Sequence, residues 1–117
     1  MLEAAREALS AIAGADPGDV NPWFFPGIGE YAALLERHEL EVTFAALFDR
    51  MTALEGGARG LADWFAMFGR ALLERQPEPH RAEFIRLVEH FAAPRLLRDG
   101  VWHADYRRLR IAARKKC

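Results

Sequence analysis

Apolar residues recur along this chain with two spacings, one typical of helices and one typical of strands. Residues 2–13 are rich in strong helix formers, and their apolar stripe has helical spacing: Leu2, Ala5, Leu9 and Ile12. We expect a second helix over residues 28–38, whose inward-facing side chains are Tyr31, Leu34 and Leu35. Turn-forming residues at 14–19 end the first helix.

The segment Asn21–Pro26 carries three consecutive aromatic residues, Trp23, Phe24 and Phe25. Pro22 and Pro26 fix their own φ angles and favour extended backbone in the residues before them, so the segment cannot be helical throughout. A loop with this much apolar surface must pack on another surface.

Strand spacing appears twice. Residues 40–48 alternate, with one face formed by Leu40, Val42, Phe44, Ala46 and Phe48. Residues 101–113 come after the turn signal Asp99-Gly100 and are rich in strand-forming residues. We expect the apolar faces of these two strands to join in one sheet.

The stretch between the strands predicts a helical hairpin. Its first apolar stripe is Leu61, Trp64, Phe65, Phe68 and Leu72, and its second is Phe84, Leu87, Val88, Phe91 and Leu96. Residues 76–79, with two prolines, separate the helices. The predicted order is α-α-β-α-α-β. This order indicates an α+β fold, an antiparallel strand pair covered by helices, in a single domain over residues 1–117.

Composition narrows the class of protein. The chain has 117 residues, 51% of them hydrophobic, which is enough for one folded domain. The formal net charge of −1 argues against a partner chosen by bulk electrostatics. The single cysteine, Cys117, excludes an internal disulfide and is expected to be an exposed tail thiol. No signal peptide or membrane span is evident, so we expect a soluble, cytoplasmic protein.

Residues suited to catalysis or cofactor binding are sparse. The glycines at 27–29 and at 56–60 lack the context of a nucleotide site, and we interpret the second group as a flexible connector. No histidine spacing suits a metal, and no nucleophile motif is present. His103, Asp105 and Tyr106 are best explained as a solvated strand face. The same holds for the basic residues after them, which makes nucleic-acid binding an unfavoured interpretation.

Aromatic residues are the best candidates for a binding site. A small apolar substrate pocket could be lined by Trp23, Phe24, Phe25, Tyr31, Trp64 and Phe68. The helical members of this set, Trp64 and Phe68, are more typical of a protein core, whereas the loop residues Trp23 and Phe24 fit either interpretation about equally.

Several segments carry a resemblance to a known family. They are Asn21-Pro22-Trp23-Phe24-Phe25-Pro26, residues 29–36, the strand-like residues 40–44, and residues 99–110 with Trp102-His103-Ala104-Asp105-Tyr106. In this order they resemble the C-terminal part of S-adenosylmethionine (SAM)-dependent methyltransferases with a Rossmann-like fold, the branch similar to trans-aconitate methyltransferase. The resemblance covers nearly the whole chain.

The resemblance implies which half of such an enzyme this is. Residues 40–48 resemble strand six of the seven-stranded sheet, residues 101–113 strand seven, and residues 61–97 a helical insertion over the substrate. The half that holds SAM has no counterpart here, so the chain is expected to bind no cofactor unless a separate SAM-binding chain complements it. Related sequences often have glycine where this chain has Glu39, at a helix end that requires positive φ.

These expectations lead to two functions. The chain is expected to be the substrate-side or assembly portion of a methyltransferase that is not catalytic alone. The alternative is a stand-alone binding or dimerisation module for a protein partner or a small apolar or carboxylate ligand. Without strand five, the strand at 101–113 has an unpaired edge, which predicts a homodimer through this strand or pairing with a SAM-binding chain.

Overall fold

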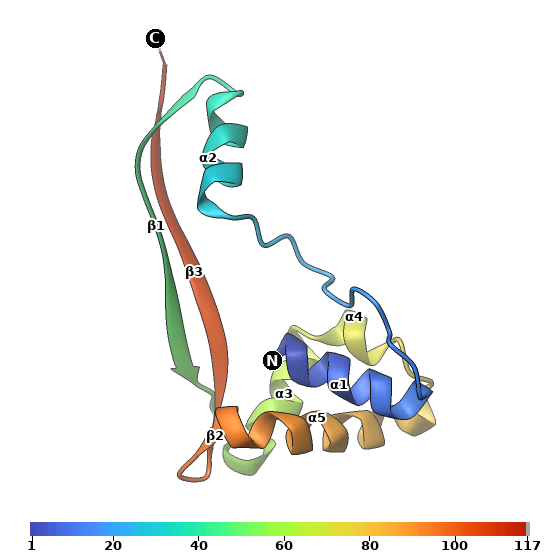
Figure 1. Cartoon of the computed structure of the whole chain (residues 1–117). Helices are drawn as coiled ribbons and strands as arrows, with labels where there is room; N and C mark the ends of the chain where they lie inside the picture. Colours follow the sequence, from blue (N-terminus) through green and yellow to red (C-terminus); the bar gives the residue numbers. More distant parts are fainter. Residues whose placement is uncertain (117) are drawn as a thin grey trace. The chain divides into compact units, whose positions relative to one another are not determined.

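The computed structural model describes residues 1–116 as a mixed helical and sheet structure, shown in Figure 1. The α-helices are α1 (Leu2–Ala13), α2 (Ile28–Glu36), α3 (Gly60–Met67), α4 (Arg70–Leu73) and α5 (Arg81–Leu96). The strands are β1 (Leu40–Ala53), β2 (Leu97–Arg98) and β3 (Val101–Lys115), and short 3₁₀ turns lie at Gly57–Arg59 (η1) and Glu78–His80 (η2). The predicted α+β class is confirmed.

Two compact units divide the chain. Unit 1 comprises residues 1–22 and 52–104, and unit 2 comprises residues 23–51 and the chain from Asp105 on. Strands β1 and β3 each contribute residues to both units. The expectation of a single domain stays a prediction, because a compact unit is not the same as a domain that folds independently.

An antiparallel sheet has the strand order β1-β3-β2. At one end of the β1–β3 pair, the amide of Leu54 donates a hydrogen bond to the Trp102 carbonyl at 2.8 Å. At the other end of the pair, the amide of Lys116 donates a hydrogen bond to the Glu39 carbonyl at 2.9 Å. The predicted pairing of the two long strands is therefore confirmed. The short strand β2 was not expected. It pairs with β3 through Leu97↔Trp102 and Arg98↔Val101.

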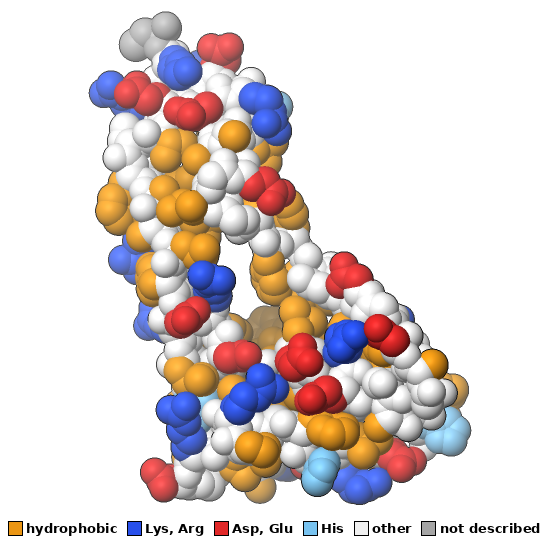
Figure 2. All heavy atoms as spheres, in the orientation of Figure 1, with side chains coloured by type: hydrophobic (Ala, Val, Ile, Leu, Met, Phe, Trp, Pro, Cys, Tyr) orange, Lys and Arg blue, Asp and Glu red, His pale blue; other side chains and the backbone are white. Residues whose placement is uncertain are grey.

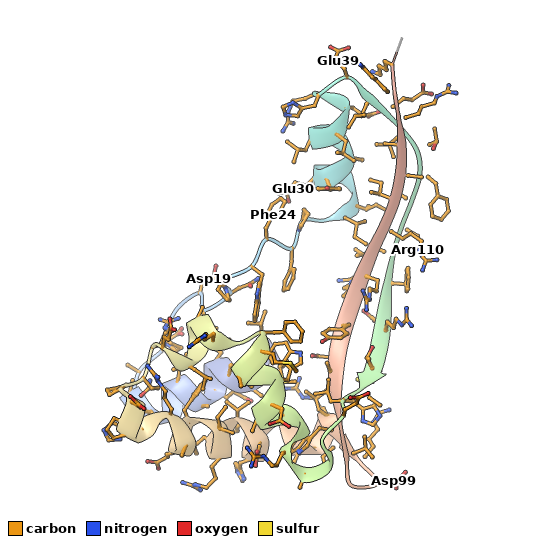
Figure 3. All side chains as sticks on the ribbon, turned by 180° about the vertical axis from the view of Figure 1, so that it is seen from behind. Asp19, Phe24, Glu30, Glu39, Asp99 and Arg110 are labelled. Carbon is orange, nitrogen blue, oxygen red and sulfur yellow. The ribbon has the colours of Figure 1, made fainter. Side chains whose placement is uncertain are left out.

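The turn between β2 and β3 explains how so short a strand can form. Asp99 and Gly100 have φ angles of 51° and 75°. Positive φ at both central residues is the geometry of a two-residue type I′ hairpin, which Asp-Gly favours. Figure 3 shows Asp99 at the tip of this hairpin.

The apolar core lies in unit 1. Its largest fully buried side chains are Phe65, Phe84, Leu61, Leu72, Leu96 and Val88. The rings of Phe65 and Phe84 meet edge to face, with 5.9 Å between centroids. On β3, Trp102 and Ala104 are also buried. Of the second predicted stripe, along α5, the residues Phe84, Val88 and Leu96 are buried, which confirms this part of the prediction.

Helix α1 packs against α5, but not through the whole predicted stripe. Its buried residues are Ala4, Ala5, Ala8 and Leu9, whereas Ile12 is 39% exposed. The prediction was wrong at Ile12, because the contact is made by small side chains that bring the two helices close together. A stripe chosen for large apolar residues misses such a face.

The first helix of the predicted hairpin is broken in two. Helix α3 ends at Met67, and α4 begins at Arg70. A Cβ atom on Gly69 would lie 2.5 Å from Cδ1 of Phe65, so the backbone here passes directly over that ring. The break turns Phe68 outward, and it is 57% exposed. Its predicted place in a buried stripe is therefore wrong.

Unit 2 is built from α2 and from most of the ribbon formed by β1 and β3 (Figure 1). None of its described residues is buried. Burial along β1 does not match the predicted alternation, since Phe44 is exposed while its neighbour Ala45 and Leu47 are half-buried. Strand β1 also runs five residues beyond the predicted end, to Ala53.

The expected strain at Glu39 is present. Glu39 has φ of 65° in the turn between α2 and β1 (Figure 3), and among the described non-glycine residues Asp99 alone shares a positive φ. Left-handed backbone crowds the Cβ atom of an L-residue, and an aspartate tolerates it better than a glutamate does.

No helix within residues 1–116 is long and apolar enough to cross a membrane.

Truncating the central core ring should strongly destabilise unit 1. Phe65→Ala is expected to lower the free energy of unfolding by about 3–5 kcal/mol, because it removes buried apolar surface and leaves a cavity. Urea unfolding monitored by circular dichroism measures the change. Met67→Ala is the matched control: Met67 is in the same helix but 68% exposed, and its loss should cost about 0.5 kcal/mol or less. Equal effects of the two variants would contradict this account of the core.

Relieving the backbone strain should stabilise the turn before β1. Glu39→Gly is expected to raise the free energy of local opening by about 1 kcal/mol, since glycine adopts positive φ without a steric cost. Hydrogen exchange of the amides at 38–42 measures that opening. Asp99→Gly serves as the comparison and should gain less. A loss of protection in Glu39→Gly would show that the glutamate side chain, and not its φ, matters at this turn.

Candidate functional site

The aromatic loop at residues 23–25 is highly exposed within unit 2. Phe24 is 64% exposed and Phe25 is 68% exposed. The rings of Trp23 and Phe25 stack on each other, with centroids 5.8 Å apart and planes inclined by 25°. Figure 3 shows Phe24 in the irregular segment that leads into α2. The loop therefore presents two aromatic rings that the described part of unit 2 leaves largely uncovered.

Polar contacts order the chain just before this loop. The carboxylate of Asp16 accepts a hydrogen bond from the amide of Gly18 at 2.9 Å and forms an ion pair with Arg6 at 2.8 Å. The carboxylate of Asp19 accepts from the amide of Asn21 at 3.0 Å. Such side-chain contacts to the backbone two residues on are typical of turns that Asp favours. The sequence prediction of a turn cluster at this place is confirmed.

The helical aromatics form a second group, in unit 1. The Trp64 ring lies 5.1 Å from the Phe65 ring and 6.0 Å from the Phe68 ring, measured between centroids. Trp64 is only 7% exposed, so it is a core residue, whereas Phe68 is open to solvent. Tyr31, the remaining candidate, is half-buried on α2 in unit 2.

The six pocket candidates are thus divided between the two units. Unit 2 holds Trp23, Phe24, Phe25 and Tyr31, and unit 1 holds Trp64 and Phe68. Within each unit the structure brings aromatic rings together: Trp23 with Phe25 in unit 2, and Trp64 with Phe68 in unit 1. A pocket lined by all six stays a prediction.

Sequence reasoning missed two open hollows in unit 1. One, of about 210 Å³, lies between the start of α1 and the turn after it and is lined by Leu2, Glu3, Arg6, Gly18, Asp19, Val20 and Asn21. The other, of about 410 Å³, lies between α1 and α5 and is lined by Glu3, Glu7, His90, Phe91, Pro94 and Arg95. A signal for the second was the i, i+4 pair Glu3 and Glu7 on one face of α1, but nothing in the sequence linked it to His90 and Arg95.

Burial raises the pKa of the Glu89 carboxyl on α5. Glu89 itself lines neither hollow. Within residues 1–116, His, Asp and Glu side chains do not gather in groups of three that could hold a metal ion.

The glycine segments lie at helix starts. Gly27 precedes α2, and residues 14–27 contain no strand, so Gly27-Ile28-Gly29 is not part of a strand–loop–helix unit. Gly56 and Gly57 lie between β1 and α3, and Gly60 is buried with Trp102 Cβ 3.4 Å from where its own Cβ would be. The interpretation of this segment as a flexible connector is therefore wrong at Gly60, which is tightly packed.

Charged residues on β3 pair in part with β1. Arg107 lies 3.5 Å from Asp49, and Arg114 lies 3.1 Å from Glu41. Both pairs are exposed, so each contributes at most about 1 kcal/mol.

Two further arginines of β3 stack on aromatic rings, Arg108 over Tyr106 at 5.5 Å and Arg110 over Phe48 at 5.6 Å. His103 Nδ1 is 3.0 Å from the Val101 carbonyl oxygen, a contact within its own strand. Cys117 lies outside the described residues.

Comparison with known proteins gives one informative relative. The chain is 32% identical over 99 residues to a protein of Schizosaccharomyces pombe named as an uncharacterized methyltransferase. The match covers 82% of this chain and 36% of that protein, so the chain spans about a third of its relative's length. No family model matches the chain. The similarity supports a relationship to methyltransferases without indicating a particular branch.

Proposed function

We propose that this chain is the substrate-side or assembly portion of a SAM-dependent methyltransferase of the trans-aconitate methyltransferase-like branch, and that it does not transfer methyl groups alone. One observation carries the proposal: a protein named as an uncharacterized methyltransferase matches 82% of this chain with 36% of its own length. The branch is inferred from the segments around Trp23-Phe24-Phe25 and Ala104-Asp105-Tyr106. SAM would then be held by a separate chain or by a further segment.

The open edge of β3 is suited to pairing with that SAM-binding chain. On this side of β3, β2 pairs only with Val101 and Trp102, and no other described strand lies beyond it. The strand carries Arg107, Arg108, Arg110, Arg114 and Lys115. Two copies joined symmetrically about the middle of residues 101–113 would set Arg107 opposite its own copy, and like charges directly opposite are unfavourable. A different chain with acidic or neutral residues avoids this repulsion.

A second function is favoured by the exposed loop. With Phe24 and Phe25 both more than half exposed, the loop at 23–25 has the character of a contact surface for an apolar ligand or a protein partner. In this alternative the chain is a stand-alone binding module for a small apolar or carboxylate ligand. The two functions differ in one respect: the module binds its ligand without any other chain.

Titration of SAM decides the first proposal. Isothermal titration of SAM into the purified chain should give no binding. The glycine segment at 56–60 follows β1 and precedes α3, but no strand lies between α3 and β2 to supply the acidic residue that a nucleotide site needs about 20 residues further on. Circular dichroism must first establish that the sample is folded. Addition of a chain that supplies the SAM-binding half should then produce binding. Low-micromolar binding by this chain alone, together with methyl transfer to a carboxylic acid acceptor, would disprove the proposal.

Substitution in the loop tests the second function. Thermal unfolding is measured with small carboxylic acids and with an apolar dye, for the unmutated chain and for Trp23→Ala and Phe24→Ala. If the loop binds, a ligand should raise the melting temperature, and either substitution should remove the shift while leaving the melting temperature without ligand unchanged within about 2 °C. Met67→Ala, an exposed apolar residue of unit 1, is the control and should keep the shift. Absence of any ligand-dependent shift counts against the module.

A further inference from the structure

Unit 2 lacks the buried side chains that hold a sheet together. No described residue in it is buried, and on β1 Phe44 is 54% exposed and Met51 is 43% exposed. Figure 2 shows hydrophobic side chains along the surface of the β1–β3 ribbon. Two strands with little burial are only marginally stable in water. This ribbon therefore gains stability from any surface that covers it or extends it.

The two edges of the ribbon differ in charge. Strand β3 carries arginines at 107, 108, 110 and 114, and charged side chains on an edge strand discourage pairing with another strand. Strand β1 is the outermost strand on the other side of the sheet. Its residues 42–48, Val-Thr-Phe-Ala-Ala-Leu-Phe, contain no charged residue, no proline and no glycine. These residues therefore provide neither the charged side chains nor the proline that usually protect an edge strand from pairing.

We propose that a second copy of this chain pairs with the β1 edge, antiparallel across a two-fold axis near Ala45. The sequence of this stretch is complementary to itself in that arrangement. A strand crossing its own copy at Ala45 sets Phe44 opposite Ala46 of the second copy, a large side chain against a small one. It also sets Thr43 opposite Leu47 of the second copy. The two β1 strands then join the two sheets into one.

Charges at the ends of this contact are also balanced. The same register brings Asp49 opposite Glu41 of the second copy. Each of these carboxylates already has an arginine partner on its own β3, Arg107 at 3.5 Å and Arg114 at 3.1 Å. The four groups at each end sum to no net charge. The middle of β3 offers no comparable uncharged run, since arginines lie at 107, 108 and 110, which is why the proposal differs from the sequence expectation of a dimer through residues 101–113.

The proposal is independent of the proposed function, because it leaves the β3 edge open for a SAM-binding chain. Sedimentation equilibrium of the chain alone tests it. The unmutated protein should sediment with twice the chain mass of 13.2 kDa. Phe44→Lys should weaken the dimer about tenfold or more, since it places a charge in the uncharged run at both symmetry-related sites. Phe68→Lys, at a site of similar exposure in unit 1, should leave the dimer unchanged.

Cysteine cross-linking locates the contact. In a background of Cys117→Ser, Ala45→Cys should form an intermolecular disulfide on mild oxidation. Residues directly opposite each other in an antiparallel pair have Cα atoms about 4.5–5.5 Å apart, within the range of about 4.4–6.8 Å that a disulfide spans. Arg107→Cys in the same background should not. A monomer at every concentration would overturn the proposal. Cross-linking through residue 107 instead of 45 would also overturn the proposal, because it would favour the contact through residues 101–113. Association only with a SAM-binding chain would overturn it as well.

Discussion

The apolar packing around Phe65 and Phe84 holds unit 1 together. These rings, the aliphatic residues of α3, α4 and α5, and the small face of α1 form the buried part of the described structure. Strand β3 starts inside this core, with Trp102 and Ala104 buried, and β1 ends beside it through the bond from Leu54 to Trp102. Hydrophobic burial therefore stabilises the part of the ribbon that belongs to unit 1, whereas unit 2 has no buried residue among those described and relies on backbone hydrogen bonds.

Elements with a strong, regular pattern could be predicted from the sequence, and elements governed by local sterics could not. The helix at 2–13 and the strand pair were predictable from periodicity and turn residues. The break at Phe68 and Gly69 was not, because a single glycine inside a helical pattern costs only about 1 kcal/mol and often leaves a helix intact. Strand β1 was predicted too short because Asp49 and Arg50 interrupt the apolar alternation. These residues are tolerated since the strand is exposed there.

The candidate site was less predictable than the fold, for a physical reason. Aromatic side chains stabilise a core and a binding surface through the same burial of apolar area, so their spacing alone does not distinguish the two. The structure separates Trp64, a core residue, from Phe24, Phe25 and Phe68, which are exposed. The relationship to methyltransferases is carried by sequence similarity to a relative and not by the arrangement of these aromatic residues.

The packing of α1 on α5 has a consequence for how the polypeptide is made. It joins residues 2–13 to residues 81–96, so a ribosome must complete most of the sequence before the alanine face of α1 finds its partner. Contacts between such distant segments form slowly, because closing a long loop costs entropy before any burial compensates it. During that interval the nascent chain already contains the uncharged run at 42–48. Until β3 has also been made, both edges of this run lack a partner strand, so its vulnerability to aggregation is greatest during translation.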